Sequence, residues 1–566
     1  MSFSVKQKQK AILRAFFRNG GGQWKVLVVD KRSSEIVSEL FRGEELRREG
    51  ITVSIPLDSK RSDKLESTTG LYLVASSAAN TKLIAEDARN EILQKMHICF
   101  LSDPAPIEQL VDSVMNPKPP KSLRISEIVT ASSDFLCQGD NLFSLTSHTH
   151  ALKPETLAHG LTCVLSMLGV VPIIRAEKGG VAEQVGEVLA DRLRAELYMG
   201  KIVQRSLISR PLLVLTDRRN NLSTALRHPW TYRAMLFDVL GLKASSVEVT
   251  VRDKGTDRSI KYNLDEDADE FWRKHSTSSF PEVASAIEAE LKTYLEEVAE
   301  VNKLGSDVSS EIASLPDLAK RKEMIDMHMN IATALLDEIK SRGLDELYRI
   351  EEDAEAGVVD WNAVMSVIKS DRGTKEDKLR LFLVCFLSGP PIGQAELDEY
   401  RQALEAAGCE SSPIEYALPL KGLAKSVPPP AKSDTRRLGL MVSGLVQQGK
   451  ANLKKGVAEV AQNFNKLMTL SRANAMPLTR IVDSFVELKG GFDNSFTYHD
   501  PKVKSGAVEN GPRNLMPFQD AIAFVVGGGN YIEYENLMEH LHGRSVVYGA
   551  SSLLGGSQFL GSLSDP

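Results

Sequence analysis

The chain has 566 residues, enough for three or four domains, and its 69 basic and 75 acidic side chains leave a net charge of −6. A hydrophobic fraction of 42% with 25% charged residues is ordinary for a folded protein and excludes a wholly disordered chain. This balance gives no support to a surface that is basic throughout, so we expect no nucleic-acid partner.

Cysteine usage and apolar runs predict a cytoplasmic protein. The five cysteines are scattered and form no CxxC pair, which fits a reducing compartment better than a disulfide framework. No segment approaches the roughly 20 apolar residues of a membrane helix, and the densest run, residues 379–387, contains Arg380. The N-terminus lacks the apolar core of a signal peptide. We therefore expect contact with membranes only through partners.

Short apolar strands alternate with helices in the first part of the chain. The predicted strands and helices, in order, lie at residues 24–30, 34–48, 51–55, 70–75, 81–93 and 97–101. Such alternation is typical of a parallel α/β sheet. The proline-rich residues 116–122 mark the edge of this first domain.

Two distant segments carry the same α/β pattern. The first has strands at residues 170–174 and 211–217 around a helix at 182–198. The second has strands at residues 521–526 and 545–548 on either side of a glycine turn and a helix. The two segments could complete one sheet, with everything between them inserted.

The middle of the chain is mostly helical. After a predicted β-hairpin at residues 246–264, two apolar stripes at helical spacing predict long helices at 281–303 and 317–341. A polar connection at residues 304–315 would join them into an antiparallel helical hairpin. Two more helices and a proline-rich linker are predicted at residues 375–387, 394–407 and 427–433.

A phosphate-loop spacing occurs at residues 444–450, but it is incomplete. Gly444, Gly449 and Lys450 fit the pattern, whereas Ala451 replaces the Ser or Thr whose hydroxyl holds magnesium. We therefore favour coincidence.

Other candidate motifs also favour structural interpretations. The glycines at residues 527–529 fit a tight strand-to-helix turn, and the acidic residues 265–269 fit the start of a helix. Two close histidine pairs, at residues 148–150 and 540–542, lack the remaining ligands of a zinc site. No cofactor and no metal are expected.

Several blocks of sequence recur in the same order in a known family. They lie at residues 24–30, 171–175, 210–218, 228–232, 280–284, 330–334, 376–382 and 524–534. The last block, FVVGGGNYIEY, is the most specific. Together they resemble the SM family (Sec-one/Munc-eighteen-like) of SNARE-assembly proteins, and in particular its Sly branch.

The resemblance implies an α/β fold plus a large α-helical region. The expected arrangement is a three-domain arch, with two parallel-sheet α/β domains and a mostly helical third domain that carries the long helical hairpin. The expected domains are residues 1–122, residues 123–244 together with 478–566, and residues 245–477.

The resemblance also implies a protein that is not an enzyme. It would bind a syntaxin-type SNARE and promote its assembly with cognate SNAREs, and hence vesicle fusion, in ER–Golgi transport. A monomer without cofactors is expected, in the cytoplasm and held at ER and Golgi membranes through SNAREs. A nucleotide-dependent enzyme that uses residues 444–450 and a passive vesicle tether remain alternatives.

Two binding surfaces follow from the resemblance. The first domain would bind the N-terminal peptide of the syntaxin through an apolar groove with acidic residues that attract a basic peptide. The expected peptide-binding residues are Asp103, Ile107, Glu108, Leu110, Val111, Asp112 and Val114. The helical hairpin would hold SNARE helices in register. The expected residues there are Val298, Val301, Leu304, Met324, Met327 and Ile331.

The sequence departs from the family at three places, one of which is the end of the first domain, where prolines interrupt a segment that is helical in relatives. After residues 216–218 the family usually continues with Asp and Pro, where this chain has Asn221 and Ala225, which we interpret as local packing changes. The connection at residues 304–315 is shorter than in Sly-branch relatives, where this loop is a lid that restrains the third domain. Whether a lid regulates this chain is left open by the sequence.

Overall fold

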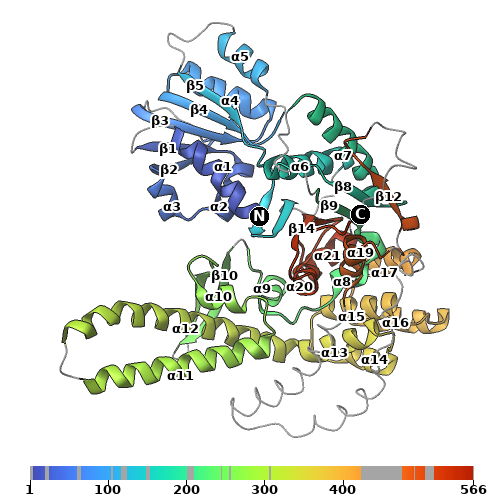
Figure 1. Ribbon diagram of the computed structural model, residues 1–566. Helices are drawn as coiled ribbons and strands as arrows, with labels where there is room; N and C mark the ends of the chain where they lie inside the picture. Colours follow the sequence, from blue (N-terminus) through green and yellow to red (C-terminus); the bar gives the residue numbers. More distant parts are fainter. Residues whose placement is uncertain are drawn as a thin grey trace. The chain divides into compact units, whose positions relative to one another are not determined.

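The computed structural model divides into two compact units (Figure 1). The described residues are 4–19, 24–59, 65–103, 106–116, 124–147, 153–200, 210–243, 245–253, 256–304, 308–421, 475–489, 491, 493–503 and 516–564. The first unit comprises Met1–Asp217, Ile481–Gly529 and Leu541–Leu553, and the second comprises Arg218–Arg480, Asn530–His540 and Leu554–Pro566. The boundaries of three separate domains stay a prediction.

A five-stranded sheet forms the N-terminal part of the first unit. Its order is β2-β1-β3-β4-β5, and every neighbouring pair is parallel, as the alternation predicts. The strands are β1 (Lys25–Val29), β2 (Ile51–Pro56), β3 (Leu65–Val74), β4 (Leu93–Phe100) and β5 (Ile125–Thr130). The sheet therefore continues past residue 122, because β5 adds an edge strand that the sequence pattern does not predict.

Helices cover this sheet, and one of them was missed by the sequence analysis. They are α1 (Val5–Asn19), α2 (Lys31–Leu40), α3 (Gly43–Arg48), α4 (Ala78–Arg89) and α5 (Ile107–Met115). The unpredicted α1 is strongly basic, and two acidic residues in and just after α3 pair with it: Glu45 of α3 contacts Lys10 at 2.8 Å, and Glu49, the residue after α3, contacts Arg18 at 2.9 Å. The single helix predicted at residues 34–48 is broken where Phe41 leaves the helical conformation.

A seven-stranded sheet joins the two distant α/β segments. Its order is β12-β8-β9-β13-β14-β7-β6, from the strands β6 (Leu136–Gly139), β7 (Leu142–Thr146), β8 (Ile173–Glu177), β9 (Leu212–Asp217), β12 (Phe496–His499), β13 (Asp520–Val526) and β14 (Ser545–Ser552). The late strand β13 pairs in parallel with the early strand β9, and β14 pairs in parallel with β7. This pairing confirms that one sheet is built from both segments. Its antiparallel edge strands, β6 and β12, were not predicted.

The glycines after β13 make a tight turn, as the sequence predicts. Gly527 and Gly528 have φ angles of 93° and 104°, in the left-handed region that favours glycine. Their backbone N–H groups donate to the hydroxyl oxygen of Ser551 at 3.1 and 3.0 Å. A side chain at Gly529 would overlap Tyr548 and Ala550. The turn is thus explained by close packing, without a bound phosphate.

The second unit is mostly helical and contains one two-stranded antiparallel sheet, β10 (Ser246–Asp253) with β11 (Thr256–Asn263). Its helices are α8 (Leu222–Leu226), α9 (Tyr232–Asp238), α10 (Glu270–His275), α11 (Phe280–Leu304), α12 (Val308–Arg342), α13 (Leu344–Glu355), α14 (Trp361–Lys369), α15 (Lys375–Ser388), α16 (Gln394–Ala406), α17 (Ser412–Ala417), α20 (Tyr531–His540) and α21 (Gly556–Ser564). The acidic residues 265–269 do start a helix, because Asp269 caps α10 by accepting from the N–H of Trp272 at 2.9 Å.

The long helical hairpin is present, but its connection is shorter than predicted. α11 and α12 lie side by side as an antiparallel pair (Figure 1). The expected start of α12 near residue 317 was wrong, because the helix begins at Val308 and continues through Pro316. Pro316 lies inside this helix, although an interior proline removes a hydrogen bond and clashes with the preceding turn. The predicted polar connection therefore forms the first turns of α12.

Several sequence features lie outside the described residues. They are the phosphate-loop spacing at residues 444–450, the linker at 427–433 and the histidine pair at 148–150. Within the described part of the chain, no helix combines the length and apolar character needed to cross a membrane. All five cysteines are free thiols, as expected, and four of them are buried.

A network of buried charges holds residues 226–228 in the second unit. The fully buried Arg380 donates to the backbone oxygens of Leu226 and Arg227 at 2.7 and 2.9 Å and pairs with Asp238 at 2.9 Å. The backbone N–H of His228 donates to Glu351 at 2.8 Å. Because these charges have no access to water, each depends on its partners.

His228 is the centre of a second group of charges in the same network. Its ring nitrogens lie 2.6 Å from Glu351 and 3.2 Å from Asp377, and Arg342 also donates to Asp377, at 2.6 and 2.9 Å. Burial and the charge of Arg380 lower the pKa of His228, but the carboxylates of Glu351 and Asp377 raise it more, so the net shift is upward. The carboxylates at both ring nitrogens therefore favour the protonated ring.

We expect Gly556→Ala to destabilise the second unit by at least about 2 kcal/mol. A Cβ at this position would overlap the Arg380 guanidinium, which cannot move without breaking its hydrogen bonds and its ion pair. Gly561→Ala in the same helix is the control, because nothing lies within 4 Å of its added Cβ. Denaturant unfolding should show a loss for the first variant and none for the second.

We also expect His228→Gln to cost more stability at about pH 6 than at about pH 9. A raised histidine pKa adds stability below the unfolded value of about 6.5, and this contribution is lost as the pH rises through the folded pKa. His275→Gln should behave oppositely, because burial and Lys274 lower the pKa of His275. Melting temperatures of both variants across this pH range check the prediction; a pH-independent loss for His228→Gln would contradict it.

Candidate protein-binding surfaces

The apolar side of helix α5 is partly buried and partly exposed. Leu110 and Val114 are at most 1% exposed and pack in a core cluster with Ile84, Ala85 and Ala88 of α4. This burial corrects the expectation that Leu110 and Val114 lie in an open groove. They sit on the inward side of the helix because the sheet must be covered by apolar side chains.

The exposed face of α5 carries an apolar stripe. Ile107, Val111 and Met115 are 43%, 49% and 42% exposed, and they recur every four residues, so they follow one side of the helix. Ile107 and Val111 were predicted as peptide-binding residues, whereas Met115 was missed. The four-residue spacing of Met115 from Val111 was the signal that could have identified it. We call these three residues the α5 stripe.

Acidic side chains border the α5 stripe. Glu108 and Asp112 are exposed, one position beyond Ile107 and Val111 along the helix, and Asp103 is half-buried at the end of β4. Asp112 accepts a hydrogen bond from the side chain of Asn116. An apolar stripe with carboxylates beside it can accept an apolar anchor from a peptide whose neighbouring residues are basic.

The helical hairpin contributes fewer exposed apolar groups than predicted. Ile331 is fully buried in the core, and Met324 and Met327 are half-buried against that core. Val298 is half-buried, and the side chains of Val301 and Leu304 lie outside the described residues. Of the predicted hairpin set, Ile331 is therefore a packing residue.

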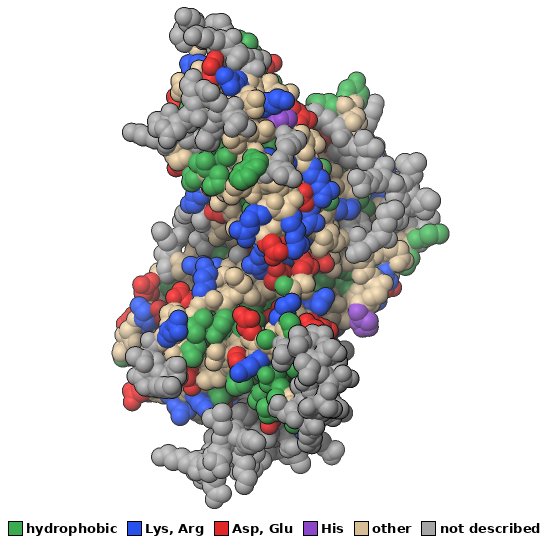
Figure 2. All heavy atoms as spheres, turned by 90° about the vertical axis from the view of Figure 1, so that its left-hand side faces the viewer, with side chains coloured by type: hydrophobic (Ala, Val, Ile, Leu, Met, Phe, Trp, Pro, Cys, Tyr) green, Lys and Arg blue, Asp and Glu red, His purple; other side chains and the backbone are tan. Residues whose placement is uncertain are grey.

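One exposed apolar side chain on the hairpin was missed. Leu295 on α11 is 56% exposed, close to an ion-pair group in which Arg321 of α12 contacts Glu290 and Glu297 at 2.8 Å. Figure 2, which views the molecule from the side toward which the hairpin points, shows acidic, basic and hydrophobic side chains interspersed.

The cysteines are poor candidates for catalysis. Burial raises the pKa of both Cys99 and Cys163 to about 12, and it raises the pKa of Cys137 and Cys385 as well. A thiol is a nucleophile only as the thiolate, so these groups are unreactive at neutral pH. Among the described residues, no group of three or more His, Cys, Asp or Glu side chains could hold a metal ion.

Comparisons with known proteins identify relatives over the whole chain. A Sec1 family profile matches residues 25–562. The human protein "Sec1 family domain-containing protein 1" is 32% identical over 99% of this chain and 97% of its own length. The Arabidopsis thaliana "SEC1 family transport protein SLY1" is 31% identical over 95% of this chain and 91% of its own.

Solved structures give the same result for the fold. The structure described as "Crystal structure of Sly1p in complex with an N-terminal peptide of Sed5p" matches with a TM-score of 0.80 and 26% identity, over 100% of this chain and 99% of that one. A second, described as "SM Protein Vps45 in Complex with Qa SNARE Tlg2", matches with a TM-score of 0.78, 19% identity, and 100% and 98% coverage. These similarities confirm the predicted fold class.

The buried and the exposed residues of α5 should respond differently to truncation. We expect Leu110→Ala to destabilise the first unit by about 2–5 kcal/mol, because it leaves a cavity in a core that excludes water. Val111→Ala, on the next residue of the same helix, should change the stability by no more than about 0.5 kcal/mol. Equal losses for the two variants in denaturant unfolding would show that the buried and exposed residues are assigned wrongly.

Proposed function

The chain belongs to the Sec1 family, and on that basis we propose that it binds a syntaxin-type SNARE and promotes SNARE complex assembly in vesicle transport between the ER and the Golgi. The α5 stripe, with Glu108 and Asp112 beside it, is the observation that carries this proposal. It is the surface on which the N-terminal peptide of the SNARE docks.

Three facts support this assignment of the stripe. Its apolar side chains are exposed although helices of this size normally turn such residues inward. The neighbouring carboxylates favour a peptide with basic residues and speed its encounter. Finally, the Sly1p structure, 26% identical over its full length, contains an N-terminal peptide of Sed5p. The peptide would place one apolar side chain between Ile107, Val111 and Met115.

The helical hairpin supplies a second surface in this proposal. Leu295, Val298, Met324 and Met327 are four of its exposed or half-buried apolar residues, and they lie on the two long helices α11 and α12. These residues contact SNARE helices and hold them in register while the SNARE complex assembles. The straight pair of helices offers the length that such a template requires.

The protein acts without enzymatic turnover and reaches ER and Golgi membranes through its SNARE partners. The candidate nucleotide site at residues 444–450 has no support from the relatives, and it lies outside the described residues. A passive tether would bind a SNARE without changing the rate of assembly. A measurement of the rate of SNARE assembly, with and without the protein, separates tethering from assembly.

We expect Val111→Lys to weaken binding of the Sed5p N-terminal peptide by at least tenfold. The lysine would replace an apolar contact and repel the basic residues of the peptide. Isothermal titration calorimetry with the full chain measures the affinity.

Val53→Lys is the matched control for that titration. Val53 is 47% exposed and lies on β2, an edge strand of the five-stranded sheet. The other edge strand of that sheet is β5. Lysine is common on edge strands. This variant should leave the peptide affinity unchanged. Equal affinities for the wild type and Val111→Lys would place the peptide elsewhere, and absence of binding by the folded wild type would remove peptide binding from the proposal.

A further inference from the structure

A buried hydrogen-bond network joins three helices of the second unit. His328 of α12 lies between Tyr232, the first residue of α9, and Asp269, the residue that caps α10. Its ring nitrogen Nδ1 lies 3.0 Å from the hydroxyl oxygen of Tyr232, and Nε2 lies 2.9 Å from a carboxylate oxygen of Asp269. The three residues are at most 8% exposed. We call these three residues the His328 network.

The hydrogen bonds of the His328 network have defined directions. Burial, and after it the charge of Asp269, raises the pKa of Tyr232, so the hydroxyl keeps its proton and donates a hydrogen bond to Nδ1. With Nδ1 as an acceptor, the ring proton lies on Nε2, which donates to Asp269. The second oxygen of Asp269 accepts from the N–H of Trp272 at 2.9 Å. Both nitrogens of His328 and both oxygens of Asp269 are therefore used.

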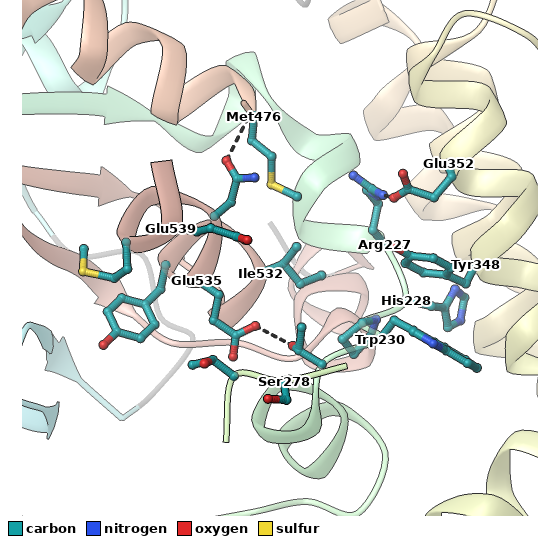
Figure 3. Close-up of a pocket in the computed structure, with 16 residues that line it drawn as sticks. Arg227, His228, Trp230, Ser278, Tyr348, Glu352, Met476, Ile532, Glu535 and Glu539 are labelled. Carbon is teal, nitrogen blue, oxygen red and sulfur yellow. Dashed lines mark hydrogen bonds and ion pairs between the residues drawn. The ribbon is translucent and has the colours of Figure 1, made fainter. Parts of the chain in front are cut away.

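The backbone at the start of α9 is fixed by further hydrogen bonds. The hydroxyl of Thr231 donates to Glu535 of α20 at 2.5 Å, and the backbone N–H of Tyr232 donates to the backbone oxygen of Ser278 at 2.9 Å. Both acceptors belong to residues that line the pocket in Figure 3, where a dashed line marks the bond to Glu535. The Tyr232 ring packs edge-on against Trp272, with ring centroids 5.4 Å apart. The hydroxyl of Tyr232 therefore has a fixed position from which it can hold α12.

The buried side of α12 is otherwise apolar. Ile331, Leu335 and Ile339 are at most 6% exposed and belong to the core of the second unit. Among the α12 residues whose side chains the structure describes, His328 is the one buried polar side chain. Apolar contacts have no preferred direction, so they permit a helix to turn slightly about its axis, whereas a hydrogen bond weakens steeply as its angle changes. A side chain that is bonded from two sides by other elements therefore fixes the rotation of α12.

This rotation sets the direction of two proposed SNARE-binding residues. Met324 and Met327 are half-buried against the core, so a small turn of α12 would bury them or expose them further. Met324 lies four residues before His328, about 40° from it around the helix at 3.6 residues per turn. Met327 is the adjoining residue, about 100° away. A second polar bond, from Asn330 to the hydroxyl of Tyr262 at 2.8 Å, restrains the same part of α12.

We propose that His328 is a positioning residue, which fixes the rotation of α12 so that the hairpin presents the same apolar groups to every SNARE helix. This role depends on the proposed function of the hairpin as a template for SNARE helices. Such a template must hold Met324 and Met327 in one direction, because a helix that binds in register contacts them at fixed intervals. A chain without the network keeps its apolar core and stays folded, but its α12 adopts several rotations and offers no single register.

Variants that remove one hydrogen bond at a time test the positioning role. Tyr232→Phe removes the donor to Nδ1, and Asp269→Ser keeps a cap for α10 but is too short to reach Nε2. The acceleration of SNARE assembly by the full chain, measured with Sed5p and its cognate SNAREs, should fall at least about threefold in both variants. Their affinity for the Sed5p N-terminal peptide should not change, because the proposed site of that peptide lies in the first unit. Asp269→Asn should retain the acceleration, since its amide can both cap α10 and donate to Nε2 while the ring proton moves to Nδ1.

NMR of the full chain labelled at its methionine methyl groups gives a readout that needs no SNARE. Tyr232→Phe and Asp269→Ser should shift or broaden the signals of Met324 and Met327, because α12 is no longer held in one rotation. Asp269→Asn should leave both signals nearly unchanged.

Val364→Ala is the matched control for a general loss of stability. Val364 is fully buried on α14, a helix outside the His328 network, and its truncation leaves a cavity in the same unit. It should lower the melting temperature at least as much as Tyr232→Phe and leave the acceleration and both methionine signals unchanged. Unchanged methionine signals in Tyr232→Phe and Asp269→Ser, or an equal loss of acceleration in Val364→Ala, would overturn the positioning role. If the wild type itself does not accelerate assembly, the proposed function fails, and the methionine signals then still decide whether the network fixes α12.

Discussion

The buried ion network around Arg380 is the constraint on which the second unit depends. Its donors reach the backbone of Leu226 and Arg227, and Glu351 holds the backbone of His228, so three consecutive residues of one loop are fixed by side chains of α13 and α15. Arg227 belongs to that fixed loop and Trp230 follows it by two residues, and both line a pocket of the second unit. A network of this kind is costly to break at any member, because each loss leaves a charge without water or partner.

In the first unit, the candidate site is positioned by the packing of a helix on a sheet. Strands from two distant segments complete the seven-stranded sheet, and a separate parallel sheet supports α5 through Leu110 and Val114. Ile107, Val111 and Met115 lie beside these two residues on the same apolar side of the helix, but they stay exposed. The proposed docking stripe is therefore the edge of the apolar side that anchors α5.

Periodicity and strand alternation were sufficient to predict most of the fold. The parallel sheet, the shared strands of the second sheet and the helical hairpin all follow from local apolar patterns. The strands β5, β6, β7 and β12 were missed, and so were helices such as α1 and α6 (Pro154–Leu168). α1 has a polar pattern that is stabilised by ion pairs with Glu45 and Glu49, which come from a later segment. The start of α12 was misplaced because an interior proline normally disfavours a helix, whereas α12 runs through Pro316.

The candidate sites were less predictable than the fold. Helical spacing does not show whether an apolar residue faces the core or solvent. Leu110 and Ile331 are buried, whereas Val111 is exposed. The His328 network could not be predicted at all, since Tyr232, Asp269 and His328 are widely separated in the chain and meet only through tertiary packing.

The central claim is that the exposed face of α5 receives the SNARE peptide. Intermolecular NOEs between the methyl groups of Ile107, Val111 and Met115 and a bound Sed5p N-terminal peptide test it most directly. The account predicts NOEs from one apolar side chain of the peptide to all three residues. NOEs confined to methyl groups elsewhere in the chain would contradict it.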